Sequence, residues 1–259
     1  MAVIRLVSAL LATAVLAVAA LPPAVGAAPA AADYTIIRSF PHNTGAWTEG
    51  LDFWRGDFYE STGLYGRSSV RRVDLTTGKV LQKRLLPDNV FGEGMAIAKG
   101  RLFVITWKER RALVYDPFSF ARLGRYDYAG EGSGLAYNGR HIVMSNLTST
   151  IRFRDPDTFK SVRSIQVKEN GVAVDQINAL AWIKGQIWAN IWLVPDILII
   201  DPATGNVVRR LDFSALQASE NAMGNAHDMN GIGYWGNEDR LFVTGKFWQR
   251  VYEIEVLPN

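Results

Sequence analysis

The stretch EGMAIAKGRLFVIT, residues 93–106, recurs in outline five times along the chain. Each copy starts with a polar residue in a short alternating segment, which a turn and a second hydrophobic segment follow. The first segments are EGLDF (49–53), EGMAI (93–97), SGLAY (133–137), NALAW (178–182) and NGIGY (230–234). The second segments are FYEST (58–62), LFVIT (102–106), HIVMS (141–145), IWANI (187–191) and LFVTG (241–245). Alternating runs of this length, separated by turn residues, predict pairs of β-strands.

A second series of repeats lies between these pairs. Its members are SVRRVDLTTGKVL (69–81), ALVYDPFSFARL (112–123), TIRFRDPDTFKSV (150–162) and ILIIDPATGNVV (197–208). Each reads as a strand, an Asp, a Pro/Thr/Gly turn and another strand. The two series together give four strands in every unit of roughly forty residues, which is the period of a propeller blade.

The fifth unit lacks its fourth strand, because the chain ends soon after residues 250–256. The N-terminal stretch YTIIRSF (34–40) has no unit of its own and can supply the missing strand. We therefore predict an all-β, five-bladed β-propeller closed by residues 34–40, because closure removes exposed sheet edges. A β-sandwich is the main alternative, but it would not explain five phased copies with a complementary N-terminal strand.

Residues 33–259 read as a single domain without an internal boundary. The one long connection, 214–229, is polar and has room for a helical turn. Before residue 33, Arg5 precedes an apolar run that ends at Pro22, and small residues follow. This pattern predicts a signal peptide over approximately residues 1–27 and a secreted or periplasmic protein. The alternative is an uncleaved membrane anchor, for which the apolar run is short.

Composition excludes several classes of protein. The chain has no Cys, so it has no disulfide, thiol nucleophile or zinc site with sulfur ligands. Its 28 Lys and Arg nearly balance 25 Asp and Glu, and no basic run occurs, which argues against nucleic acid binding. The 8 Trp, 9 Tyr, 12 Phe and 23 Gly suit an all-β chain with many turns. We expect a monomer.

Propeller geometry brings polar residues to one mouth of the central channel, where the innermost strands begin and the second strands end. The innermost strands begin with Glu49, Glu93, Ser133, Asn178 and Asn230. The ends of the second strands bring Thr62, Trp107, Lys108, Asn146, Trp192 and Lys246, and the incoming connections bring His42, Trp47, Phe91 and Glu131. Each of these residues alone could serve a turn or pack between blades. As a set, aromatic walls with a few polar groups predict a pocket for a small molecule or a peptide end.

Other chemistries fit the sequence poorly. The three histidines have no metal-ligand spacing, so we expect no metal and no cofactor. Ser133 in GEGSG is out of register for a nucleophile elbow, and Gly245-Lys246 lacks the context of a phosphate-binding loop.

An ordered set of motifs, which spans the chain after residue 33, carries a family resemblance. It comprises FPHNTGAWTEGL (40–51), FYESTGLYGRSSVRRVDLTTGKVL (58–81), FGEGMA (91–96), TWK (106–108), YAGEGSGL (128–135), FRDPDTF (153–159), IWANIW (187–192), IIDPATG (199–205), MNGIGY (229–234) and TGKFW (244–248). With these the sequence resembles the plant-type glutaminyl-peptide cyclotransferases, which also occur in bacteria. The resemblance implies a five-bladed propeller and an acyltransferase that converts N-terminal Gln of peptides to pyroglutamate with release of ammonia.

The resemblance also implies roles for individual residues. Glu93 in FGEG matches the proton-shuttling carboxylate of the family, a general acid and base. Trp107 and Trp192 match aromatic residues of its substrate pocket, Asn178 an amide that contacts substrate, and Lys246 a pocket lysine. Trp47 stands where the family usually has another aromatic residue.

Three departures from the family pattern fall at the predicted mouth. The family typically has TQGL, EGWGL and LNELE, where this chain has Thr48-Glu49-Gly50, Ser133, and Asn178 followed by Ala179-Leu180-Ala181. Loss of the aromatic residue at Ser133 is expected to enlarge or reshape the pocket. For Glu49 two roles are open: coupled titration with Glu93, or binding of the substrate ammonium.

These departures keep two alternatives to the cyclase open. One is a non-catalytic propeller that binds peptide ends or another ligand. The other is a metal-dependent, lactonase-like hydrolase, in which Glu49, Glu93, Asn178 and Asn230 would supply the metal ligands.

Overall fold

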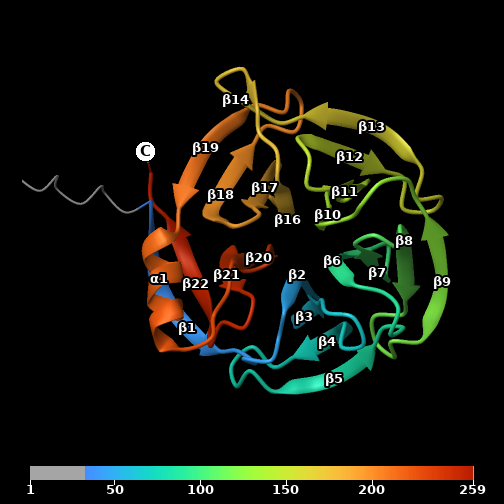
Figure 1. The fold of residues 1–259 in the computed structure, drawn as a ribbon, viewed down its shortest axis with the longest axis horizontal. Helices are drawn as coiled ribbons and strands as arrows, with labels where there is room; N and C mark the ends of the chain where they lie inside the picture. Colours follow the sequence, from blue (N-terminus) through green and yellow to red (C-terminus); the bar gives the residue numbers. More distant parts are fainter. Residues whose placement is uncertain (1–32, 259) are drawn as a thin grey trace, which may run out of the picture. The chain divides into compact units, whose positions relative to one another are not determined.

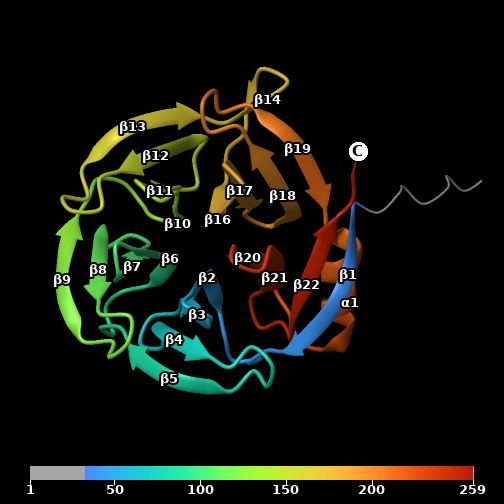
Figure 2. The same ribbon diagram turned by 180° about the vertical axis from the view of Figure 1, so that it is seen from behind.

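The computed structural model describes residues 33–258, so the expected signal peptide, residues 1–27, lies outside the described residues. Residues 33–258 contain five four-stranded antiparallel sheets arranged around a common axis, which is a five-bladed β-propeller (Figure 1). The first strand of each sheet lies next to the axis and the fourth lies on the outer rim, as the reverse view also shows (Figure 2). The predicted fold class is therefore confirmed.

Each blade has the strand order that the repeats predict. Blade one contains β2 (Thr48–Trp54), β3 (Asp57–Thr62), β4 (Ser69–Val73) and β5 (Val80–Leu85). Blade two contains β6 (Gly92–Ala98), β7 (Arg101–Thr106), β8 (Arg111–Tyr115) and β9 (Arg122–Asp127). Blade three contains β10 (Leu135–Tyr137), β11 (Ile142–Met144), β12 (Thr150–Arg154) and β13 (Ser161–Gln166). Blade four contains β16 (Ile177–Ile183), β17 (Gln186–Ile191), β18 (Val194–Ile200) and β19 (Val207–Asp212).

Blade five combines the two ends of the described chain. It contains β20 (Met229–Trp235), β21 (Arg240–Gly245), β22 (Arg250–Val256) and β1 (Tyr34–Pro41). β1 pairs antiparallel with β22 as the outermost strand, from Tyr34 opposite Val256 to Pro41 opposite Arg250. The N-terminal strand therefore closes the ring, as the sequence predicts. A short hairpin that the repeats did not predict, β14 (Lys168–Glu169) and β15 (Val172–Ala173), lies between blades three and four.

A buried hydrogen-bond network, the closure network, fastens the end of β1 to its neighbours. It consists of His42, Thr48, Glu60 and Arg71. His42 Nε2 contacts Glu60 Oε1 at 2.9 Å, and His42 Nδ1 contacts the carbonyl oxygen of Trp248 at 2.9 Å. Thr48 Oγ1 donates to Glu60 at 2.7 Å, and Arg71 Nη1 lies 3.6 Å from the same carboxylate. An imidazolium beside an ionised Glu60 satisfies both ring nitrogens of His42, since each of them lies next to an acceptor.

Glycine in the second position of the repeated segments allows the innermost strands to approach one another. A Cβ atom on Gly94 would lie 2.5 Å from the backbone nitrogen of Leu135, and one on Gly50 would lie 2.6 Å from that of Met95. Neither position can hold a larger residue without moving backbone. The Glu-Gly pairs of blades one and two thus place a carboxylate where the blades crowd around the axis.

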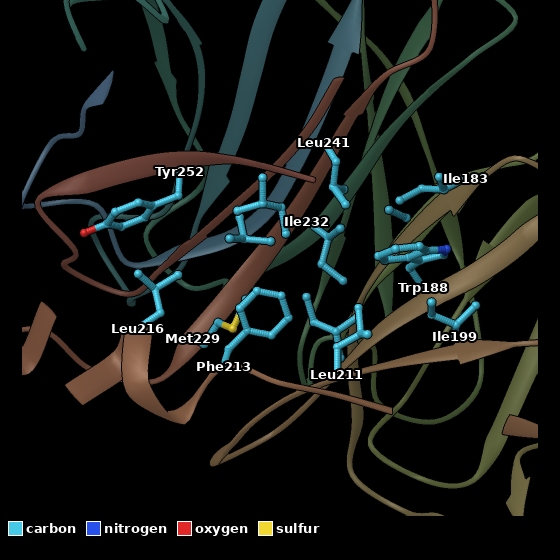
Figure 3. Packing of buried hydrophobic residues seen from close by; sticks show 14 of the residues in the cluster. Ile183, Trp188, Ile199, Leu211, Phe213, Leu216, Met229, Ile232, Leu241 and Tyr252 are labelled. Carbon is cyan, nitrogen blue, oxygen red and sulfur yellow. The ribbon is translucent and has the colours of Figure 1, made fainter. Parts of the chain in front are cut away.

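Hydrophobic side chains fill the spaces between blades. Between blades four and five, Trp188, Ile199, Ile232 and Leu241 interdigitate with neighbouring side chains (Figure 3). Burial on this scale, at about 25 cal/mol per Å² of apolar surface, stabilises a chain that has no disulfides.

The long connection before β20 forms a helix, α1 (Ser214–Met223), where the sequence suggested only a helical turn. α1 lies outside the ring next to β22 and β1 (Figure 1). Its Leu216 enters the hydrophobic core, and its buried Glu220 accepts hydrogen bonds from Tyr252 Oη at 2.6 Å and from the Gln249 backbone at 2.9 Å. Within residues 33–258, no helix is both long and apolar enough to cross a membrane.

Candidate active site

A pocket of about 170 Å³ opens at the mouth where the innermost strands begin. Its lining residues are Trp47, Glu49, Phe91, Glu93, Trp107, Leu147, Asn178, Trp192 and Lys246. The structure thus brings all seven predicted site residues into one pocket, although their chemical roles stay predictions. Phe91, which the sequence placed at the mouth without a role, completes the aromatic wall.

Indole and phenyl rings form most of this wall. Trp47 packs against Phe247 at 5.1 Å and His227 at 5.2 Å between ring centroids, so the end of the α1 connection does reach the mouth. Trp107 lies edge-on to Phe91 at 5.7 Å and donates from Nε1 to Glu131 at 3.0 Å. These contacts fix the orientation of two indoles. Flat apolar faces of this kind suit the aliphatic part of a substrate side chain.

Trp192 and Leu147 bound the pocket from blades four and three. Trp192 follows β17 and is 37% exposed, so one edge of the wall faces solvent. Leu147 follows β11, and its backbone has a φ of 61°, a left-handed conformation that is uncommon for leucine. Hydrogen bonds of its N–H to Ile177 O and of its carbonyl to the N–H of Gln176 hold this conformation. Leu147 was not predicted from the sequence, because nothing in the repeat pattern indicates this turn.

Ser133 is not part of the pocket lining, contrary to expectation. Its side chain is buried beneath the mouth, where its hydroxyl contacts Ser145 Oγ at 2.9 Å and the Ile177 carbonyl at 3.1 Å. β10 accordingly begins only at Leu135. Leu147 is the residue of blade three that lines the cavity.

Two carboxyl groups and one ammonium group form the polar floor. Glu49, Glu93 and Lys246 are all buried, and Lys246 Nζ lies 3.5 Å from Glu49 Oε1. The buried side-chain amide of Asn230 donates to Glu49 Oε2 at 2.7 Å and to the Thr48 carbonyl at 3.0 Å. Asn230 therefore lies beneath the pocket and orients Glu49, instead of facing the cavity.

The surroundings of Glu49 and Glu93 favour the protonated form of a carboxyl group on this floor. Burial raises the pKa of Glu93 well above its usual value, the adjacent charge of Glu49 raises this pKa further, and Lys246 only partly opposes them. Burial also raises the pKa of Glu49, against the opposing effect of Lys246. A carboxyl group with a raised pKa keeps its proton to higher pH, so it can donate as well as accept a proton, which is what acid–base catalysis needs.

The polar side chains on the floor of the pocket do not resemble the ligands of a metal centre. Across residues 33–258, no three His, Asp or Glu side chains are grouped so that they could hold a metal ion. Glu49 is already engaged by Lys246 and Asn230. The metal-dependent alternative therefore gains no support from the floor of the pocket.

Comparison with known families and structures gives the context of this pocket. The family model for glutamine cyclotransferase matches residues 7–256. The chain belongs to this family. The match extends over all five blades, so the pocket lies in a family member with a complete propeller.

Two relatives agree with this assignment. The chain is 36% identical over 227 residues to a glutaminyl-peptide cyclotransferase of Arabidopsis thaliana, covering 85% of this chain and 70% of the relative. Among solved structures, it is similar to the Myxococcus xanthus glutaminyl cyclase, with a TM-score of 0.81 and 37% identity, over 87% of this chain and 97% of that chain.

Proposed function

We propose that this chain is a glutaminyl-peptide cyclotransferase that converts an N-terminal glutamine to pyroglutamate and releases ammonia. The observation that carries the proposal is the protonatable Glu93 at the floor of an indole-walled pocket, in a member of the glutamine cyclotransferase family. The pocket is small and closed at its base, which suits one terminal side chain and its amine.

The reaction is a transfer within one residue of the substrate. The neutral α-amine attacks the γ-carboxamide carbon, a C–N bond forms, and the original C–N bond breaks as ammonia leaves. One proton must move from the attacking nitrogen to the leaving nitrogen, and Glu93 can perform both transfers. Holding the side chain curled over its own amine lowers the barrier further, as in other intramolecular reactions.

The other lining residues have complementary tasks. The faces of Trp107 and Trp192 hold the aliphatic part of the glutamine side chain. The amide of Asn178 and the ammonium of Lys246 can stabilise the oxygen charge of the tetrahedral intermediate, because they are buried donors that line a largely apolar pocket. No metal or cofactor takes part in this scheme.

A panel of dipeptides tests the proposal. We expect Gln-initiated dipeptides to yield pyroglutamate, and their N-acetylated forms to remain unchanged, because the attacking amine is blocked. Glu-initiated dipeptides should react at a rate that is lower by roughly 100-fold or more. Their side-chain carboxylate would lie beside two buried carboxyl groups, which repel a further negative charge. Mass spectrometry of the products measures each outcome. Ammonia release from the N-acetylated peptide would indicate an amidase and contradict the proposal.

We also propose that the mature protein is exported, because residues 1–27 have the pattern of a signal peptide. Expression of the full chain in a bacterial host should give a periplasmic or extracellular protein that starts near residue 28. N-terminal sequencing of the fractionated protein checks this, and an intact leader in the cytoplasm would contradict it.

A further inference from the structure

The floor of the pocket contains one more acidic group than basic groups. Glu49 and Glu93 supply two carboxyls and Lys246 supplies one ammonium, and all three side chains are at most 7% exposed. A buried charge without a partner is costly, so the favoured state of such a group is electrically neutral. Neutrality with one ammonium requires one ionised and one protonated carboxyl group.

The contacts indicate which carboxyl is ionised. Glu49 receives the Asn230 amide on Oε2 at 2.7 Å and the Lys246 ammonium near Oε1 at 3.5 Å. Its backbone neighbour Thr48 is held on both sides, by Asn230 at its carbonyl and by Glu60 at its hydroxyl. Glu49 is therefore the carboxyl group whose ionised form has two donors.

Glu93 lies on the neighbouring blade and lines the same pocket as Glu49 and Lys246. Burial disfavours a charge on Glu93, and the negative charge of Glu49 disfavours a second one beside it. The Lys246 ion pair and the Asn230 hydrogen bond both go to Glu49, so a charge on Glu93 is the less well compensated of the two. Glu93 is thus the carboxyl group for which the protonated form is favoured.

We propose that Glu49 is a positioning residue, which retains Lys246 and thereby keeps a proton on Glu93 in the resting enzyme. The proposal rests on the proposed function and deepens it, because it assigns the order of the proton transfers. Glu93 acts first as an acid and gives its proton to the leaving nitrogen as the C–N bond breaks. The resulting carboxylate then takes the proton of the new ring nitrogen, which restores the resting state.

A titration that does not depend on turnover tests the protonation state. The protein is labelled with ¹³C at the glutamate carboxyl carbons, and carboxyl resonances are followed by NMR against pH. In the wild type we expect one resonance, absent in Glu93→Gln, to titrate well above the usual range for glutamate. Titration of that resonance in the ordinary range overturns the proposal, and this test needs no variant of Glu49.

The role of Glu49 is tested by Glu49→Gln, with Glu238→Gln as a control for removal of one distant carboxylate. In Glu49→Gln we expect the Glu93 resonance to titrate at lower pH, since a negative charge is removed and Lys246 is freed. In Glu238→Gln it should not move. An unchanged Glu93 titration in folded Glu49→Gln overturns the assignment.

The pH profile of kcat/KM for a Gln-initiated dipeptide gives the kinetic readout. The limb that reports loss of the Glu93 proton should shift to lower pH in Glu49→Gln and stay in place in Glu238→Gln. A general structural role of Glu49 would lower the rate without moving this limb. If the wild type shows no turnover, the proposed function fails, while the NMR titration still decides whether the two carboxyls share one proton.

Discussion

Replacing Glu93 by glutamine is expected to lower kcat for cyclisation of a Gln-initiated dipeptide by about 10²- to 10⁴-fold, the usual contribution of a general acid–base group. The amide keeps the size of the side chain but can no longer transfer a proton between the two nitrogens. Because Glu93 is held protonated in the resting state, a neutral amide should fit the same site, so the unfolding temperature should not fall. Initial rates and thermal melts of the same samples measure both effects.

The control for this variant is Glu238→Gln, the same substitution at an exposed position beyond β20. It should leave rate and melting temperature close to those of the wild type. Retention of full activity by folded Glu93→Gln would show that another group moves the proton. If Glu93→Gln lost activity because its structure was disrupted, its melting temperature would be lower than that of the wild type.

Replacing His42 by alanine is expected to destabilise the protein by about 3–5 kcal/mol, because it leaves Glu60 buried with only Arg71 as a charged partner. The exposed pair Lys184–Asp239, with side chains 64% and 60% exposed, provides the matched control. Lys184→Ala should cost far less than His42→Ala, since solvent screens a surface pair. Denaturant unfolding of both variants measures the difference.

The cost of His42→Ala should also depend on pH. Burial alone would lower the pKa of His42, but the adjacent Glu60 more than compensates, so this pKa is raised. Burial alone would raise the pKa of Glu60, but its charged partners outweigh that effect, so this pKa is lowered. The contribution of His42 to the free energy of unfolding is complete below pH 6.5, and it is lost as the pH rises through the raised pKa of His42. The contribution of Glu60 to the free energy of unfolding is present above pH 4.5, and it is lost as the pH falls through the lowered pKa of Glu60.

The two windows overlap, so His42→Ala should cost most between pH 4.5 and 6.5 and less on either side. Unfolding free energies of wild type and variant across this range check the sign. A cost that does not vary with pH would contradict the charged histidine and favour a neutral one.

The sequence predicted the fold well because its repeats are local and regular. The five segments that begin with Glu49, Glu93, Ser133, Asn178 and Asn230 gave the phase of the blades, and the unpaired stretch 34–40 gave the closure. The hairpin of β14 and β15 was missed, because its two-residue strands are too short for an alternating pattern. The helix α1 was underestimated, since its polar composition resembles a loop and its burial of Leu216 and Glu220 depends on blade five.

The site residues that lie at the ends of strands could be predicted from the sequence. Trp107, Trp192 and Lys246 are found at the mouth because each directly follows a second strand. Leu147 could not be predicted, since only a left-handed backbone directs it into the pocket. Ser133 was misplaced, because its hydroxyl finds partners in Ser145 and Ile177 that no local pattern reveals.

This pocket is expected to cyclise N-terminal glutamine without a metal. The most direct measurement is ammonia release from a Gln-initiated dipeptide by the purified mature protein in the presence of a chelator. We predict one ammonia per pyroglutamate formed, at a rate that the chelator does not change and that Glu93→Gln lowers by about 10²- to 10⁴-fold. No ammonia from the correctly folded wild type, or release that stops with the chelator, would contradict this account.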